Sequence, residues 1–569
     1  MDGWKRQIGK YLDILYAGED RKLAENLLDE LYERWAPEKR GEKEELSEKD
    51  CMLIAYGDCI WEDGKAPLQS LDEFLGEFCG ETITNVHLLP VFPYTSDDGF
   101  SVQNYKEIDS RLGNWEDIQR LGDGAGVMMD AVVNHSSKSH PWFQECIQGK
   151  FPYTQYYIEC DPSGDYSGVT RPRALPLLTE IDTVEGKKWF WTTFSDDQMD
   201  LNFKSPYLLK EIIELLLFYA KMGARFIRLD AVGFIWKKKG TACMHLEETH
   251  AVVKLMCRFL EMFYPGTYII TETNVPHLEN ISYFGDGDEA HLVYQFPLPP
   301  LVLHTMLSQN TEKLAKWADG LKDTPLPAGR SFFNFLASHD GIGIRPVDGI
   351  LDEKEKAALY DAVKKRGGKI SYKQNEDGSM SPYELNINYL SAVTDPLETD
   401  MQKKAACFLA SQAIMLSMQG VPGIYYHSLL GSGNWEDGAE KSGINRRINR
   451  EKLMRSQLER ELSQEGSLRS RVFEGYTKLL NVRKRQKAFS PFAGQKILDC
   501  GSEIFALERE NGQKIRVYIN VTDHAARFPE GRHAAGRDLL KDKKMVRLQE
   551  LEPFEVLWVE QCQEDLWTN

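Results

Sequence analysis

Short apolar runs alternate with helical patterns from about residue 50 onward. Most runs are apolar throughout and end in a polar residue, which is typical of strands buried on both faces. Amphipathic helical segments lie between several of them, for example residues 205–223 and 311–321. The candidate strands are residues 52–58, 85–93, 126–135, 224–232, 267–274, 291–299, 332–340 and 423–427. This alternation predicts an α/β protein built on a closed parallel (β/α)8 barrel of the TIM type.

The segments outside this repeat predict further parts of the molecule. Residues 1–47 have apolar positions at helical spacing, and we interpret them as an N-terminal helical extension that caps the barrel, with a homodimer contact as the alternative. The barrel itself is expected over residues 48–488. Its connections at about 138–205 and 341–400 are too long for turns and indicate inserted loop domains. Residues 489–569 alternate between strand and turn patterns, which predicts a C-terminal all-β domain.

The charge of the chain narrows the classes of partner. Of 569 residues, 42% are hydrophobic and 27% are charged, which is ordinary for a globular protein. The net charge of −18 argues against a nucleic-acid partner, because such binding depends on neutralising phosphates. An anionic substrate would therefore have to be attracted by a local cluster of arginine or lysine.

The distribution of apolar residues and cysteines suggests where the protein works. The first residues have no apolar core of signal-peptide length, and no run of about 18 apolar residues predicts a membrane span. The 10 cysteines show no metal-binding spacing, so we expect free thiols in a reducing compartment. A cytoplasmic location follows as the simplest expectation, with no cofactor.

Polar side chains stand at the C-terminal ends of several predicted strands. Because all strand ends of a parallel barrel face one mouth, these side chains should converge. Taken singly, each has a structural explanation, such as a helix cap or a hydrogen-bonded core histidine. Taken together, like charges in one mouth destabilise the fold unless they are used. The residues are Asp130, Asn134, His135, Arg228, Asp230, Glu272, His339 and Asp340.

The three carboxylates at separate strand ends suggest a reaction. Two carboxylates suffice for cleaving a glycosidic bond with retention, since one attacks the anomeric carbon and the other, kept protonated, protonates the leaving oxygen. A third can hold sugar hydroxyls and favour the positively charged transition state. Within residues 226–234, FIRLDAVGF, Arg228 and Asp230 could be only an internal ion pair, or Asp230 could be the attacking group.

Four ordered segments carry a family resemblance. The segments DAVVNH, FIRLDAVGF, ITETN and FLASHDG resemble the signature regions of the α-amylase superfamily, glycoside hydrolase family 13, over roughly residues 50–563. The resemblance implies that Asp230 is the nucleophile, Glu272 the general acid/base and Asp340 the transition-state stabiliser. It further implies that the donor sugar is positioned by His135, Arg228 and His339. No metal is expected, although Asn134 holds calcium in some amylases.

The segments around residues 87–117 and RLDAVGF are similar to those of sucrose phosphorylases. That similarity implies that Asp97 and Arg446 bind the donor glucose and that Tyr383 and Glu384 belong to the acceptor loop. The family pattern has glutamine where Glu384 stands, which leaves sucrose itself open as a substrate.

The helical extension and the segments SHDGIGIRP and ITETNVPH look more like the glucosylglycerate phosphorylases of the same subfamily. An anionic acceptor needs a guanidinium group, and Arg345, five residues beyond Asp340, is the candidate. An exposed loop arginine is the alternative explanation of that residue.

The resemblance therefore implies a retaining α-glucoside phosphorylase. The enzyme would transfer a glucosyl unit through a covalent Asp230 intermediate to inorganic phosphate, giving α-glucose 1-phosphate, with glucosylglycerate as the favoured donor. The alternatives are a sucrose or sucrose 6'-phosphate phosphorylase, an α-glucosidase or glucosyltransferase, and an inactive partner subunit. The natural acceptor, the preference for phosphate over water and the oligomeric state stay open.

Overall fold

A closed barrel of parallel strands forms the centre of the molecule. The computed structural model describes residues 2–38, 44–173, 175–324, 326–374 and 379–561, and within them eight strands close in the order β1-β17-β13-β12-β11-β10-β4-β3. Each strand overlaps one of the predicted runs, so the prediction of a (β/α)8 barrel is confirmed. The strands are β1 (Met52–Ala55), β3 (Asn85–Leu88), β4 (Gly126–Ala131), β10 (Ala224–Leu229), β11 (Tyr268–Thr271), β12 (Leu292–Tyr294), β13 (Ser331–Phe335) and β17 (Val421–Tyr425).

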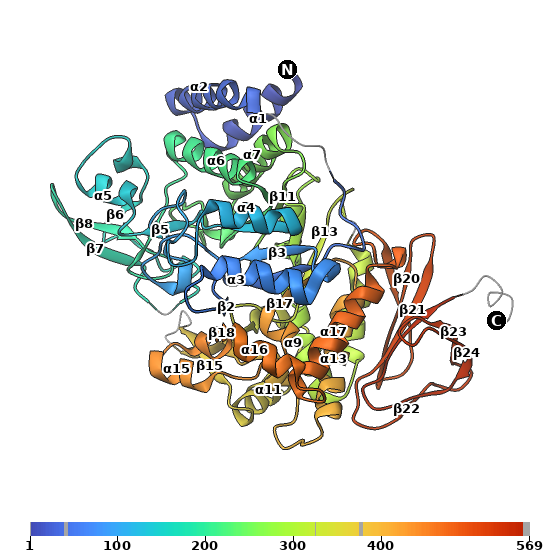
Figure 1. Cartoon of the computed structure of the whole chain (residues 1–569). Coiled ribbons are helices and arrows are strands. Elements are labelled where there is room, and N and C mark those ends of the chain that lie inside the picture. The colour runs from blue at the N-terminus through green and yellow to red at the C-terminus, as the bar shows by residue number, and fades with distance from the viewer. Residues whose placement is uncertain (1, 39–43, 174, 325, 375–378, 562–569) are drawn as a thin grey trace.

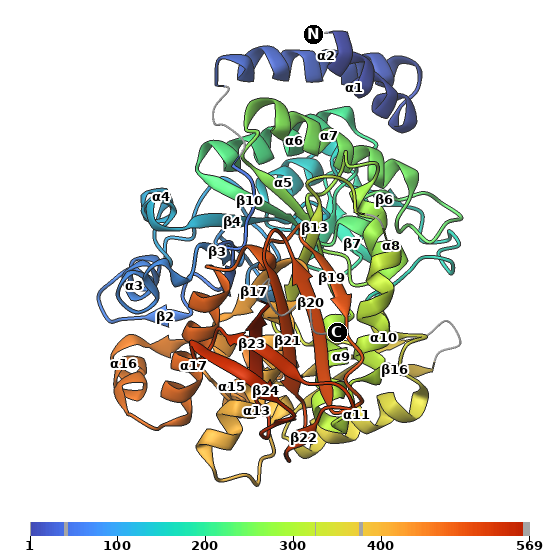
Figure 2. The ribbon, with the colours of Figure 1, turned by 90° about the vertical axis from the view of Figure 1, so that its right-hand side faces the viewer.

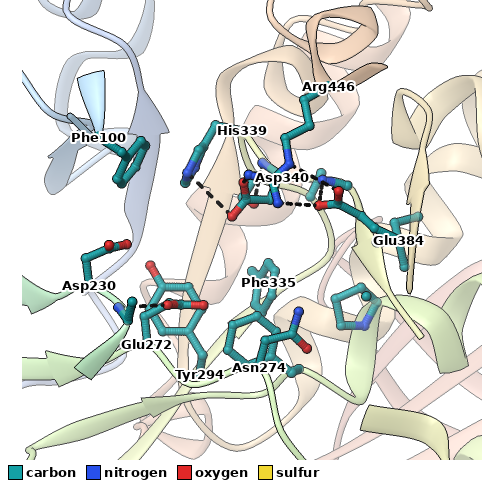
Figure 3. Close-up of a pocket in the computed structure, with 18 of the residues that line it drawn as sticks. Phe100, Asp230, Glu272, Asn274, Tyr294, Phe335, His339, Asp340, Glu384 and Arg446 are labelled. Carbon is teal, nitrogen blue, oxygen red and sulfur yellow. Dashed lines mark hydrogen bonds and ion pairs between the residues drawn. The ribbon is translucent and has the colours of Figure 1, made fainter. Parts of the chain in front are cut away.

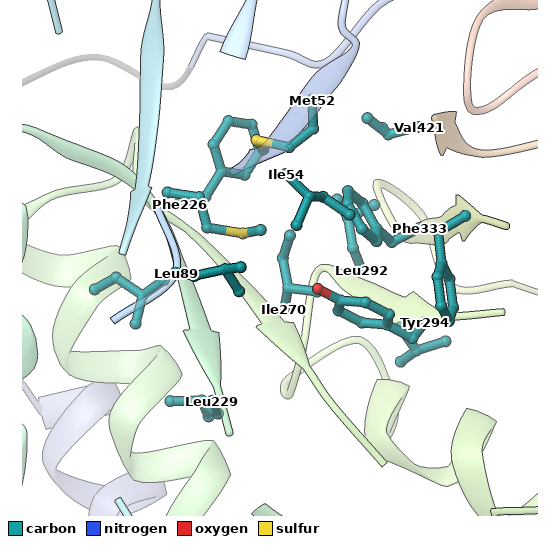
Figure 4. Packing of buried hydrophobic residues seen from close by; sticks show 14 of the residues in the cluster. Met52, Ile54, Leu89, Phe226, Leu229, Ile270, Leu292, Tyr294, Phe333 and Val421 are labelled. Carbon is teal, nitrogen blue, oxygen red and sulfur yellow. The ribbon is translucent and has the colours of Figure 1, made fainter. Parts of the chain in front are cut away.

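Apolar side chains fill the interior of the barrel. Met52, Phe226, Leu292 and Phe333 point toward one another from separate strands and are buried (Figure 4). A barrel of this size is filled by side chains, so it has no pore and can hold its strand ends rigidly. The surrounding helices are α3 (Pro67–Phe74), α4 (Trp115–Gly124), α6 (Pro206–Lys221), α7 (Glu247–Phe263), α8 (His277–Ile281), α9 (Leu298–Ser308), α10 (Glu312–Gly320), α13 (Met401–Ser417) and α17 (Leu468–Arg483).

The N-terminal extension folds as two helices that cover the outer ring. Helices α1 (Asp2–Leu15) and α2 (Gly18–Trp35) lie over α7 and α6, at the top of Figure 1. Trp4 stacks on Tyr32 with ring centroids 4.8 Å apart, and the hydroxyl of Tyr11 donates to Asp288 at 2.9 Å. The extension therefore packs against the barrel of its own chain.

Two long insertions rise from the C-terminal ends of the strands. The one after β4 holds β5 (His135–Ser137), α5 (Pro141–Ile147), β6 (Glu159–Cys160), β7 (Leu178–Thr183), β8 (Gly186–Trp191) and β9 (Gln198–Asp200). The one after β13 holds β14 (Ile342–Gly343), η9 (Arg345–Val347), α11 (Glu353–Lys365), β15 (Lys369–Gln374), β16 (Met380–Asn386) and α12 (Tyr389–Val393). Both predicted long connections thus have secondary structure of their own.

The C-terminal part is an antiparallel sheet beside the barrel (Figure 2). Its order is β19-β20-β21-β26-β23-β24. Arg509, fully buried, donates to the carbonyl oxygens of Ser417, Ser490 and Ala493 at 2.8 to 3.1 Å and so joins the sheet to the end of α13. The strands are β19 (Gly494–Ile497), β20 (Ile504–Glu510), β21 (Lys514–Asn520), β23 (Ala534–Asp538), β24 (Lys543–Leu548) and β26 (Val556–Glu560).

The expectations about cysteines and membrane spans can be compared with the part of the chain that the structure describes. The cysteines of the described residues are all free, as the spacing suggested. Among the helices of those residues, none is long and apolar enough to cross a lipid bilayer.

Candidate active site

The C-terminal ends of the barrel strands open into one pocket (Figure 3). It encloses about 1120 Å³, including solvent at its mouth. All the residues predicted for catalysis or sugar binding line it except Arg345, whereas Asp130 and Asn134, expected at the same mouth, are buried outside its lining. The predicted residues that line it are Asp97, His135, Arg228, Asp230, Glu272, His339, Asp340, Tyr383, Glu384 and Arg446.

Asp230 and Arg228 form the ion pair that their spacing suggested, and it lies inside this pocket. The two residues alternate along the end of β10, and Arg228 Nη1 donates to Asp230 Oδ1 at 2.9 Å. The same nitrogen donates to Asp130, whose other oxygen is 2.8 Å from His87 Nε2. Arg228 is buried and held by β4 as well as by its own strand, so it fixes the orientation of Asp230.

Asp230 shares the pocket with Glu272, a second carboxyl group whose pKa is raised. Burial raises the pKa of both carboxyl groups. Charge repulsion from Glu272 raises the pKa of Asp230 further, and repulsion from Asp340 raises that of Glu272. Arg228 lies 2.9 Å from Asp230 but 3.9 Å from Glu272 Oε2, so it favours the negative charge on Asp230.

The backbone after Asp230 also contributes to the position of Glu272. Ala231 has a left-handed φ of 48°, a conformation in which a residue with a Cβ atom is strained. In this conformation its N–H donates to Glu272 Oε2 at 3.2 Å. The strand end of β10 thus orients carboxylates from two neighbouring strands.

Arg446 connects Asp340 to the acceptor loop. Arg446 Nη1 is 2.6 Å from Asp340 Oδ1, and its Nη2 and Nε bind Glu384 at 3.0 and 3.1 Å (Figure 3). The N–H of Gly341 also donates to Glu384, at 2.7 Å. Although burial opposes ionisation, Arg446 and His339 hold the pKa of Asp340 well below its usual range. The charge of Glu384 is therefore already neutralised, by Arg446 and not by Arg345.

Asp97 lines the pocket from a strained turn. Asp97 and Asp98 both have left-handed φ angles, 54° and 49°. Arg173 Nη2 binds Asp97 Oδ2 at 2.8 Å. Burial would raise the pKa of Asp97, but Arg173 and Arg446 lower it well below the usual value. Asp97 is consequently an ionised acceptor of hydrogen bonds.

The two histidines are neutral and packed around Phe100. Burial lowers the pKa of His135 to about 4 and that of His339 to about 3. His135 Nε2 lies 2.9 Å from the carbonyl oxygen of Phe100, and the His339 ring stacks on the Phe100 ring at 4.8 Å. Both imidazoles line the pocket as uncharged, flat rings, which suit contact with a sugar ring.

A buried lysine connects the first insertion to the barrel. Lys237 Nζ binds Asp200 Oδ2 at 2.6 Å and the amide oxygen of Asn134 at 2.8 Å. Asp200 lies on β9, two residues beyond Gln198, whose side chain contacts His135 and Asp97 in the pocket. This network holds the wall that carries Gln198.

The structure adds the pocket residues Arg173 and Gln198, and the buried Lys237 that supports the pocket wall, all of which sequence reasoning missed. Arg173, Gln198 and Lys237 lie in or beside irregular segments, and no periodicity or strand end marks them. The only signal is the RPR segment around residue 172, in which two arginines flank a proline inside an insertion already expected to reach the mouth. Arg345 lines an adjoining pocket instead, 3.8 Å from Glu279.

The described residues contain no group of three or more histidine, cysteine or acidic side chains arranged to hold a metal ion. At Asn134, the neighbouring Lys237 ammonium occupies the place beside Asp200 that a cation would take. These residues do not fit a calcium ion.

Comparison with known proteins finds relatives in the α-amylase family and among its phosphorylases. The α-amylase catalytic domain model matches residues 80–379. A glucosylglycerate phosphorylase of Spirochaeta thermophila is 47% identical over 522 residues, which cover 90% of this chain and 88% of that protein. One from Allomeiothermus silvanus is 45% identical over 558 residues, 98% of each chain. The crystal structure of sucrose 6F-phosphate phosphorylase from Thermoanaerobacter thermosaccharolyticum shares the fold, with a TM-score of 0.73 at 24% identity over 85% of this chain and 95% of that one.

Proposed function

Because the chain belongs to the α-amylase family, glycoside hydrolase family 13, we propose that it is a retaining α-glucoside phosphorylase acting on glucosylglycerate. Relatives that bear the name glucosylglycerate phosphorylase match it at 45% and 47% identity over most of its length. The observation that carries the chemistry is the position of Arg228, bound to Asp230 and farther from Glu272. This position favours the negative charge on Asp230 over that on Glu272, which supports a division into nucleophile and acid.

The first step transfers glucose to the enzyme. The Asp230 carboxylate attacks the anomeric carbon, and the bond from that carbon to the glyceryl oxygen breaks as Glu272 gives its proton to that oxygen. Glycerate leaves, and a β-glucosyl ester of Asp230 remains. The developing positive charge on the sugar is next to Asp340, which Arg446 keeps ionised.

The second step releases the sugar. A phosphate oxygen attacks the anomeric carbon from the face that glycerate left, the ester bond to Asp230 breaks, and Glu272 takes the proton of the phosphate hydroxyl. Two inversions give α-glucose 1-phosphate with net retention. Asp97, Arg446, His135 and His339 hold the glucosyl unit throughout, which suits a single terminal glucose.

The test is synthesis in reverse with α-glucose 1-phosphate as donor. D-glycerate, fructose, fructose 6-phosphate and water are offered separately, and phosphate release is measured. Release that requires glycerate is the expected result. Release with fructose or its phosphate would favour the sucrose-type alternative, and release with water alone would contradict a phosphorylase.

Matched variants assign the chemistry to the pocket. Asp230→Asn is expected to abolish phosphate release with every acceptor, whereas Asp361→Asn, which neutralises an exposed carboxylate on α11, should keep the wild-type rate. Full turnover by Asp230→Asn would refute the role of Asp230.

A further inference from the structure

A second pocket adjoins the first on the side of Glu272. Glu272, Asn274 and Tyr383 line both, so they form the boundary between them; Glu272 and Asn274 are labelled in Figure 3. The second pocket has apolar walls and three cationic side chains. The apolar residues include Phe194, Phe234 and Met244, and the cations are Arg171, Arg345 and Lys373.

The three cations reach this pocket from both insertions. Arg171 lies in the first insertion before β7, Arg345 begins η9, and Lys373 is on β15 of the second insertion. All three are partly buried. Long cationic side chains on a free surface would normally extend into water, so their gathering at one pocket from three separate segments is informative.

Their charges are poorly neutralised within the protein. Among the described residues, Arg171 and Lys373 form no side-chain hydrogen bond or ion pair, and Arg345 has only Glu279, at 3.8 Å. The arginines of the first pocket differ, because Arg228 and Arg446 each bind carboxylates at 2.6 to 2.9 Å. Among the described residues that line the second pocket, the cations thus outnumber the acids, since Glu272 is the one acidic side chain there.

This surplus is notable in a chain whose net charge is −18, since the overall field repels anions. The first pocket holds ionised carboxylates for a cationic transition state. The second offers guanidinium and ammonium groups, which bind carboxylates and phosphates through charge-assisted hydrogen bonds. The boundary residue Glu272 is the group that exchanges a proton with whatever occupies the second pocket.

We propose that Arg171, Arg345 and Lys373 form one anion subsite, which holds the carboxylate of the glycerate leaving group and then the incoming phosphate. The inference rests on the proposed function, because it assigns the acceptor side of the same reaction. Glycerate and phosphate share a hydroxyl beside a negative charge, so one set of cations can orient either hydroxyl toward Glu272. Water lacks that charge and gains nothing from the subsite, which accounts for a preference for phosphate.

The test separates acceptor charge from acceptor shape. α-Glucosyl fluoride serves as donor, and KM and kcat are measured for D-glycerate, for glycerol, which replaces the carboxylate by a neutral hydroxymethyl group, and for phosphate. The variants are Arg171→Gln, Arg345→Gln, Lys373→Met and the triple substitution. Lys364→Met, an exposed lysine of α11, is the control, and thermal unfolding checks that each variant folds.

Each single variant is expected to raise KM for glycerate and phosphate roughly tenfold, the loss of one hydrogen bond between charged groups, while KM for glycerol changes less than about twofold. The triple variant should lose the preference for glycerate over glycerol. An unchanged KM for glycerate in the triple variant overturns the inference, as does an equal loss with glycerol. If the wild type itself uses neither glycerate nor phosphate, the proposed function fails first, and that result is distinguishable from the other two.

Discussion

Removing the buried ammonium of Lys237 should loosen the insertion that forms one wall of the pocket. Lys237→Met keeps most of the side-chain volume but leaves the Asp200 carboxylate buried without its cation. Asp200 would retain the N–H of Thr193 at 2.8 Å, the hydroxyl of Thr193 at 2.6 Å and the amide of Asn134 at 3.2 Å. Loss of one partner of a buried ion pair destabilises a protein by about 3–5 kcal/mol, and these remaining hydrogen bonds put the expected value near the lower end.

A double-mutant cycle isolates the interaction between the two charges. Asp200→Asn alone leaves Lys237 with the amide oxygen of Asn134 as its partner and should destabilise the protein at least as much. Lys237→Met with Asp200→Asn removes both charges, so the double variant should be more stable than either single one. We expect a coupling of at least about 3 kcal/mol between the two sites, because two single losses of about 3 kcal/mol each combine to less than either one.

Thermal unfolding of the four proteins, with hydrogen exchange of the amides of β9, measures the effect. The single variants should unfold several degrees earlier and exchange faster in β9, and their KM for the glucosyl donor should rise because Gln198 loses its fixed position. A double variant whose loss of stability equals the sum of the two single losses would refute the account, because the two charges would then act independently.

Three other predictions follow from single contacts. Arg509→Met should lower the free energy of unfolding by at least about 3 kcal/mol, because it leaves several buried carbonyl oxygens without a donor. The control Arg532→Met, at the surface, should change the free energy of unfolding little, and thermal unfolding measures both. Glu384→Gln should lower kcat/KM for glycerate about tenfold, because Arg446 loses the carboxylate that binds two of its guanidinium nitrogens. An unchanged kcat/KM would contradict this. Because the pKa of Asp97 is lower in the folded protein than in the unfolded chain, its carboxylate stabilises the fold above about pH 5, and this contribution is lost as the pH falls through the native pKa. On acidification, the thermal unfolding midpoint of Asp97→Asn should therefore fall less than that of the wild type.

The barrel was predictable because its signals are local. Each strand is a short apolar run that ends in a polar residue, and the closure of a parallel barrel then brings the ends together whatever the sequence separation. Asp230, Glu272 and Asp340 could be brought together by that geometry alone.

The pairings inside the pocket could not be predicted, because they join residues far apart in the chain. Arg446 binds Glu384 across 62 residues, and Arg173 binds Asp97 across 76. Sequence position made Arg345 the candidate for binding an anionic acceptor in the mouth of the barrel, and the fold of the second insertion directs it to the adjoining pocket. Irregular segments carry no periodicity, so the direction of their side chains follows only from tertiary packing.

Trapping the covalent intermediate tests the central claim most directly. The protein is incubated with 5-fluoro-α-glucosyl fluoride, which slows release of the sugar, then quenched and digested for mass spectrometry. The account predicts one added fluoroglucosyl group, on the peptide that contains Asp230, and its loss when phosphate is supplied with formation of the α-glucosyl phosphate. A label on another residue, or an inverted β-product formed without any label, would contradict it.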